Sequence, residues 1–144
     1  MIEEARTLIT SSTHGTLSTL EAGSGHPYGS LVALVASPQG EVAMLLSTLA
    51  EHTTNLTADP TSSILLRAQP APEQTPLQAA RVSILGTTAR LDDPGPWRER
   101  FLTAHPDAAA YVGFSDFSFY LLTPTRLRFI AGFGRMGWIG AEEF

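Results

Sequence analysis

Two residue types are missing from this chain of 144 residues, and each absence removes a class of chemistry. Without cysteine, disulfides, thiolate metal sites and cysteine nucleophiles are excluded. All nine basic residues are arginine, and the lack of lysine excludes Schiff-base catalysis and a Walker-type phosphate site. Any anion that this chain binds must therefore be held by arginine, histidine, hydroxyl groups or backbone amides.

Positive charge and long apolar runs are also scarce. The net charge of −5 argues against a duplex nucleic-acid binder, which normally carries a basic face. The longest apolar run, residues 31–36, is far shorter than the roughly 20 residues of a membrane span. Glu3 and Glu4 stand where a signal peptide would be basic. We therefore expect a cytoplasmic protein that binds neither nucleic acid nor membrane, folded as one domain over residues 1–144.

The hydrophobic pattern predicts a mostly β domain. Apolar residues at helical spacing indicate a short N-terminal helix. Alternating or Val/Leu-rich segments separated by Gly and Pro indicate strands joined by tight turns. Helices are expected at 2–11, 48–58 and 97–105, and strands at 16–20, 28–36, 41–46, 63–68, 80–91, 117–123 and 126–133. The last strand pair is separated by Pro124, and residues 134–144 show no usable period. Six or seven strands of this kind favour a small antiparallel barrel.

The start of the second helix is the most informative stretch for function. Thr48 and Glu51 fit a capping box, and a helix N-terminus offers free backbone N–H groups to an anion. Ser47, His52 and Thr53 add hydroxyl and imidazole donors nearby. The alternative interpretation is an ordinary capped helix with no ligand.

A Gly-x-Gly-x-x-Gly pattern occurs at residues 132–137. A dinucleotide-binding site needs a helix after this motif and an acidic residue about twenty positions later, and the chain ends before either. Arg135 and Trp138 in this segment suit phosphate binding and ring stacking, or simple surface packing.

The four histidines have no metal-ligand spacing, so no metal site is predicted. No residue pattern identifies a catalytic acid, base or nucleophile.

Several motifs together resemble one known family. They are Gly-Thr-Leu-Ser-Thr-Leu at 15–20, Pro-Tyr-Gly-Ser-Leu-Val at 27–32, Leu-Leu-Ser-Thr-Leu-Ala-Glu-His-Thr-Thr-Asn-Leu at 45–56 and Ala-Gly-Phe-Gly-Arg at 131–135. The chain resembles the pyridoxamine 5′-phosphate oxidase-like FMN-binding split barrels over residues 2–139, and most closely the branch that includes heme-utilisation proteins.

The resemblance implies a six-stranded antiparallel split β-barrel that forms a homodimer, with a small-molecule cofactor or substrate in the cleft between subunits. By position, it implies that FMN contacts come from Tyr28, Ser30, Leu31, Ser47, Thr48, His52, Thr53, Arg81, Arg135 and Trp138. The lysines that serve the phosphate in the oxidase are absent here, and no histidine follows His105 where heme-degrading relatives carry one.

Three functions follow from the resemblance. The first is an FMN-dependent oxidoreductase of unknown substrate, in which the flavin supplies the chemistry. The second is a heme-binding or heme-degrading protein. The third is a dimeric binding module without a cofactor.

Overall fold

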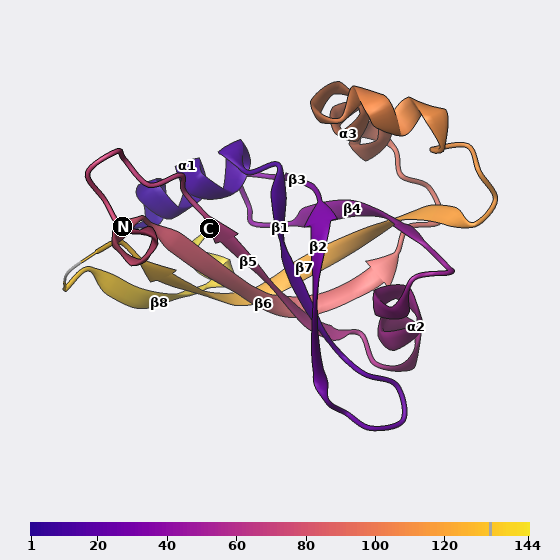
Figure 1. Cartoon of the computed structure of the whole chain (residues 1–144), viewed down its shortest axis with the longest axis horizontal. Coiled ribbons are helices and arrows are strands. Elements are labelled where there is room, and N and C mark those ends of the chain that lie inside the picture. Colours follow the sequence, from indigo (N-terminus) through magenta and orange to yellow (C-terminus); the bar gives the residue numbers. More distant parts are fainter. Residues whose placement is uncertain (133) are drawn as a thin grey trace.

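The computed structural model describes residues 1–132 and 134–144, and within them one antiparallel sheet of eight strands curls into a split barrel (Figure 1). The strands are β1 (His14–Leu20), β2 (Pro27–Ala33), β3 (Val35–Ala36), β4 (Val42–Ser47), β5 (Thr61–Arg67), β6 (Arg81–Arg90), β7 (Phe117–Ile130) and β8 (Met136–Gly140). Their order is β2-β1-β5-β6-β7-β4-β3, and β8 pairs with β7. The predicted antiparallel split barrel is confirmed.

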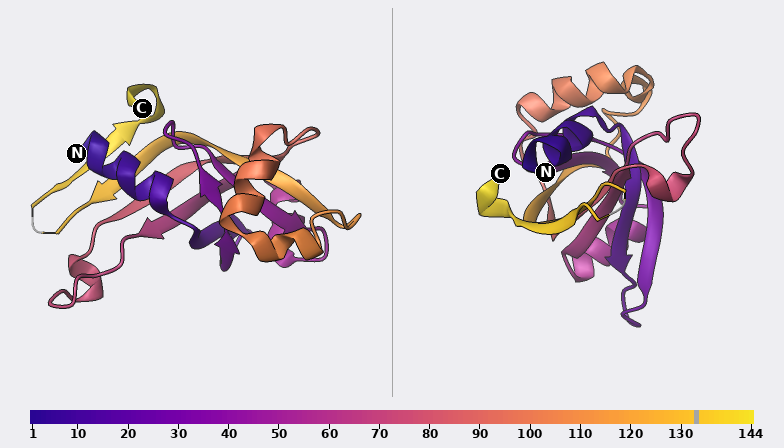
Figure 2. Two further views of the ribbon diagram at one scale, coloured as in Figure 1. Left: turned by 90° about the horizontal axis from the view of Figure 1, so that it is seen from above. Right: turned by 90° about the vertical axis from the view of Figure 1, so that its left-hand side faces the viewer.

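Three α-helices cover the sheet at different places (Figures 1 and 2). They are α1 (Ile2–Ser11), α2 (Glu51–Ala58) and α3 (Pro96–Ala104), and short 3-10 turns lie at Pro76–Gln78, Pro106–Ala110 and Ala141–Glu143. The amphipathic α1 buries Ala5, Leu8 and Ile9 against the main core. Its Arg6 donates a hydrogen bond to the backbone oxygen of Phe144 over 3.3 Å, so the two chain ends lie together. No described helix is long and apolar enough to cross a membrane.

The core follows from strand alternation. Every second side chain of β1, β5 and β6 is buried, as Leu17, Ile64 and Ile84 show. These side chains join residues of α1, β4 and β7 in one cluster. A second cluster under α3 centres on Phe101 and Phe119. The remaining side chains of β1, β2, β5 and β6 point away from the core.

The prediction of six strands is wrong, because the sheet has eight. Residues 28–36 do not form one strand: the chain leaves β1 at Ala33 and pairs with β4 from Val35. The buried Leu34 between them donates its N–H to Thr13 over 2.9 Å. Residues 134–144, for which the sequence pattern predicts no element, contribute β8, whose Ile139 is buried opposite Leu127. The predicted end of a strand at Phe133 lies outside the described residues.

Pro124 was expected to separate two strands, yet β7 runs through it. The opposite position is Gly86, where the register between β6 and β7 shifts. A Cβ on Gly86 would lie 2.0 Å from the carbonyl oxygen of Thr123. Only glycine allows the backbones to approach this closely, and the bulge accommodates a residue without an N–H. The expected strand at 80–91 is therefore irregular at Gly86.

Candidate functional site

The residues predicted from the resemblance fall into two separate places. The first is the α2 cluster, formed by Ser30, Ser47, Thr48, His52 and Thr53. Ser30 lies on β2 opposite the buried Leu17, and its hydroxyl lies 3.1 Å from Nδ1 of His52 in the first turn of α2. Tyr28 is two residues away on the same side of β2 and is partly exposed. The structure thus brings Ser30 and His52 together, and their contact with FMN stays a prediction.

Two polar atoms of the α2 cluster are buried without a partner among the described residues. They are Nε2 of His52 and Oγ1 of Thr53, a residue that is 2% exposed. Burial lowers the pKa of His52 below its ordinary value, so the imidazole is neutral at pH 7. Its neighbour Glu51 is acidic and exposed. The cluster can donate hydrogen bonds to an anion but offers it no fixed positive charge.

The predicted capping box of α2 is wrong. The helix begins after Ala50, and no side chain caps it. Thr48 instead donates its backbone N–H to the carbonyl of Asp116 over 2.8 Å. The Ser47 hydroxyl donates to Oδ2 of Asp116 over 2.9 Å and accepts the N–H of Leu49 over 3.1 Å. Ser47 and Thr48 are therefore occupied in fixing the end of β4 to the segment before β7. Sequence reasoning missed Asp116 because its partners are about seventy residues away.

The Asn55 position of the His-Thr-x-Asn motif has a structural role that needs no ligand. Its side-chain amide donates to Thr19 Oγ1 over 3.0 Å and accepts the N–H of Ala22 over 3.1 Å. Asn55 and Thr19 are both buried, so each amide group is satisfied where water cannot reach it. This residue holds α2 against β1 and the turn that follows.

The second place is the outer face of the sheet, on the side away from the core. Register aligns six of its side chains across successive strands: Leu31, Thr16, Leu65, Ser83, Arg128 and Trp138. Leu31 is 78% exposed, Trp138 49% and Leu65 43%. Large apolar side chains this exposed, gathered on one sheet face, are typical of a binding surface. Of the predicted residues, Leu31, Arg81 and Trp138 lie here.

Among the described strand residues of the outer face, arginine is the only charged type. Arg126 and Arg128 lie over the Trp138 ring, with guanidinium carbons 4.3 and 5.5 Å from its centroid. Arg67 and Arg81 stand opposite each other on β5 and β6. Within the described part of the chain, none of these four comes within 4.0 Å of a carboxylate. The outer face therefore carries uncompensated positive charge although the chain as a whole is acidic.

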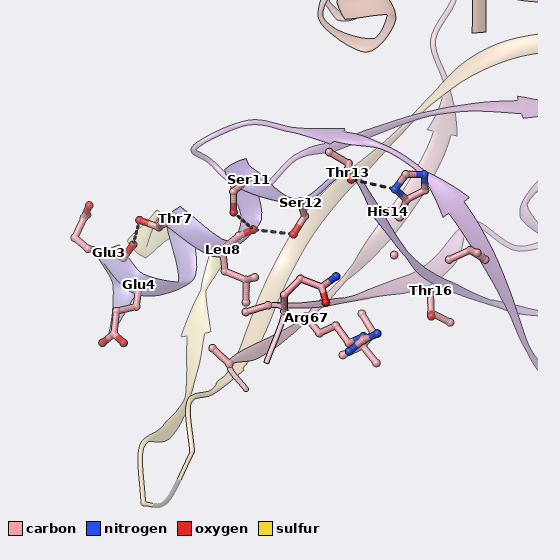
Figure 3. Close-up of a pocket in the computed structure, with 16 residues that line it drawn as sticks. Glu3, Glu4, Thr7, Leu8, Ser11, Ser12, Thr13, His14, Thr16 and Arg67 are labelled. Carbon is pink, nitrogen blue, oxygen red and sulfur yellow. Dashed lines mark hydrogen bonds between the residues drawn. The ribbon is translucent and has the colours of Figure 1, made fainter. Parts of the chain in front are cut away.

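A groove of about 850 Å³ lies where α1 meets the outer face (Figure 3). Its walls include His14, Thr16, Leu31, Leu65 and Arg67 from the sheet. We call it the α1 groove.

The carboxylates of the α1 groove come from Glu3 and Glu4, and both are paired. Glu3 pairs with Arg6, and Glu4 pairs with Arg135. The side chain of Arg135, predicted to contact the ligand, is thus paired with Glu4 of α1. Arg67 is left as the uncompensated charge of the groove.

Sequence reasoning missed His14, Arg67, Arg126 and Arg128. Alternation along 14–20 and 61–67 was the available signal, because it places His14 and Arg67 on the face opposite Leu17 and Leu66. The pairing of β1 with β5, which joins segments far apart in the chain, was needed to bring them together.

Comparison with known proteins shows the family. The CREG β-barrel family model matches residues 2–144. This chain belongs to that family. It is 33% identical over 146 residues to the non-canonical heme oxygenase HOZ, chloroplastic, of Arabidopsis thaliana, covering 99% of this chain and 44% of HOZ. The chain therefore spans less than half the length of this curated relative.

Solved structures agree with the assignment. The heme binding protein from Mycobacterium smegmatis has a TM-score of 0.90 and 38% identity, over 99% of this chain and 58% of that one. A protein of the pyridoxinephosphate oxidase family from Clostridium acetobutylicum, related to general stress protein 26, shares the fold alone. Its TM-score is 0.74 with 14% identity, over 99% and 95% of the two chains. The resemblance to oxidase-like split barrels, and to their heme-utilisation branch, is confirmed.

Proposed function

We propose that this CREG-family chain binds heme on its outer face, as a homodimer. The observation that carries the proposal is the combination of exposed apolar side chains with uncompensated arginines. Heme is a flat apolar ring with two carboxylates, so Leu31, Leu65 and Trp138 suit its plane and the arginines suit its carboxylates. Two relatives of at least 33% identity carry heme in their names, which supports this ligand over FMN, the first expectation.

The same face supports a dimer of two copies of this chain. Exposed leucines favour burial against an apolar partner. Two such faces packed directly would also bring together arginines of equal charge, at a cost in free energy. A dianionic ligand between the two copies removes that repulsion. Dimer formation and ligand binding are therefore expected to reinforce each other.

When bound, heme would supply an iron that exchanges one electron and binds small ligands such as oxygen. The part of this chain is to orient the ring, exclude water from its buried face and neutralise its carboxylates. These roles need no catalytic acid or base from the protein.

The test is titration of the purified protein with hemin, followed by absorbance. We expect a saturable Soret band and, by light scattering, a particle of about twice 15.4 kDa. Arg128→Gln should weaken binding about tenfold, because it removes a charge-assisted contact to a carboxylate. The matched control is Arg98→Gln, which removes an exposed arginine of α3. A wild-type monomer without a Soret band would contradict the proposal, and a dimer without one would indicate the cofactor-free module.

FMN is the second candidate, carried by the two unpartnered polar atoms of the α2 cluster. The Thr53 hydroxyl and Nε2 of His52 are buried, and a phosphate oxygen would satisfy them. When bound, FMN would supply the two-electron chemistry of an oxidoreductase on a substrate still to be found.

The corresponding test is FMN titration of the wild type and of His52→Ala with Thr53→Ala. The double variant should weaken FMN binding and leave the dimer folded. Unchanged affinity would place the phosphate elsewhere, and no affinity in the wild type would remove FMN as a candidate.

A further inference from the structure

We infer that His14 and Arg67 form an iron-ligating and carboxylate-binding pair in the α1 groove, where a heme ring would pack against Leu31 and Leu65. This inference rests on the proposed heme binding and names the site and the role of each residue. Neither residue belongs to the positions that the family resemblance implies.

His14 is distinguished from the other three histidines by its surroundings. The Nδ1 atom of His52 lies beside Ser30, and His105 is buried with Nε2 2.9 Å from the carbonyl oxygen of Leu34. His26 lies exposed in the turn between β1 and β2. Only His14 lines the α1 groove.

The His14 ring is oriented for ligation. Its Nδ1 lies 3.0 Å from Thr13 Oγ1. With the proton on Nδ1 and donated to this hydroxyl, Nε2 carries the lone pair that binds iron. No described residue forms a hydrogen bond with Nε2. The ring also meets His105 edge-on, with centroids 5.3 Å apart at 85°, and His105 is itself packed on Phe101. Packing against the buried His105 thus fixes the orientation of the His14 ring.

Arg67 lies on the same face as His14, and both residues line the α1 groove. The pairing of β1 with β5 ends at Thr16 and Leu65, and His14 and Arg67 each lie two residues beyond this last pair. The neighbouring Arg81 donates to the carbonyl oxygen of Leu77 over 2.6 Å, whereas Arg67 has no carboxylate partner in the described chain. An arginine whose donors have no protein partner is suited to bind a carboxylate.

A single histidine limits the kind of metal group that the α1 groove can bind. Within the described residues, no three His, Asp or Glu side chains come together to hold a bare ion. One imidazole can still ligate a metal that a macrocycle already carries, as in globins and peroxidases. The groove volume of about 850 Å³ falls within the range of cofactor sites, roughly 300–1,000 Å³.

The iron ligand is tested by hemin titration of His14→Ala and of His26→Ala, the matched control on an exposed histidine. We expect His14→Ala to bind hemin about tenfold more weakly or worse, with a displaced Soret band. Added imidazole should restore the wild-type spectrum, which a merely structural role would not allow. His14→Gln, which keeps side-chain volume beside His105, should show the same loss of ligation if His14→Ala folds poorly.

The carboxylate partner is tested with two forms of the ligand. Arg67→Gln should weaken binding of hemin about tenfold but leave binding of hemin dimethyl ester, which lacks free carboxylates, unchanged. The Soret position should stay that of the wild type, because His14 remains.

The outcomes separate this inference from the proposed function. If the wild type binds hemin and His14→Ala matches His26→Ala in spectrum and affinity, the ligand assignment is overturned while heme binding stands. Equal losses of both hemin forms in Arg67→Gln would overturn the role of Arg67. A wild type that binds no hemin would overturn both the inference and the proposed function.

Discussion

The α2 cluster and the outer face differ in how their polar groups are satisfied. In the α2 cluster, Ser47 bonds to Asp116 and Ser30 to His52, and the imidazole is neutral. On the outer face, four arginines and a tryptophan stand without carboxylate partners in the described chain. The first region carries the denser sequence motif and the second carries the uncompensated charge. Motif density thus reflects internal hydrogen bonding as much as ligand binding.

Loss of the buried Asn55 amide of α2 should have the largest effect. Asn55→Ala removes two hydrogen bonds and leaves the N–H of Ala22 and the Thr19 hydroxyl without that partner. We expect the free energy of unfolding, measured with urea, to fall by about 2–3 kcal/mol. Thr54→Ala, at an exposed position of the same helix, is the control. Equal small effects of the two variants would show that Asn55 does not hold α2 in place.

The orphan hydroxyl of Thr53 should act in the opposite direction. Thr53→Val keeps the shape of a buried side chain and removes an oxygen that has no partner in the described chain. The apo protein should become more stable by roughly 1 kcal/mol, while any FMN affinity falls. Lower thermal stability of the variant would mean that the hydroxyl already has a partner, such as water, in the apo protein.

The smallest effect is expected from the titration of His52. Because burial lowers its pKa, the unfolded chain takes up a proton near the ordinary value of 6.5 while the folded chain does not. The free energy of unfolding therefore falls as pH drops below about 6.5. His52→Gln should lose less stability than the wild type between pH 7.5 and 5.5 in urea titrations. Parallel curves would show that His52 titrates normally.

The same contrast explains what the sequence could predict. Alternation and turn residues were sufficient for α1 and most strands, because these signals are local. The passage of β7 through Pro124 was not predictable, since it depends on Gly86, a residue 38 positions earlier, at the bulge between the two strands. β8 was missed because glycines interrupt the alternation of a five-residue strand.

Some residues of the candidate site could be predicted from the sequence, and others could not. Ser30 and His52 were predicted as cofactor contacts from two separate motifs, and their side chains lie 3.1 Å apart. His14 and Arg67 had only a weak local signal, because their proximity comes from the pairing of β1 with β5. Uncompensated charge is a property of the assembled sheet, and a linear sequence does not show which arginines lack a partner.

We expect the outer face, rather than the α2 cluster, to bind heme. The most direct measurement is hemin titration of the wild type, of Leu65→Asp on the outer face, and of His52→Ala with Thr53→Ala in the α2 cluster, all at one protein concentration. A carboxylate in place of Leu65 would oppose both the apolar ring and its acidic groups. We predict loss of the Soret band in Leu65→Asp and an unchanged dissociation constant in the double variant. Unchanged binding by Leu65→Asp together with loss in the double variant would contradict the account.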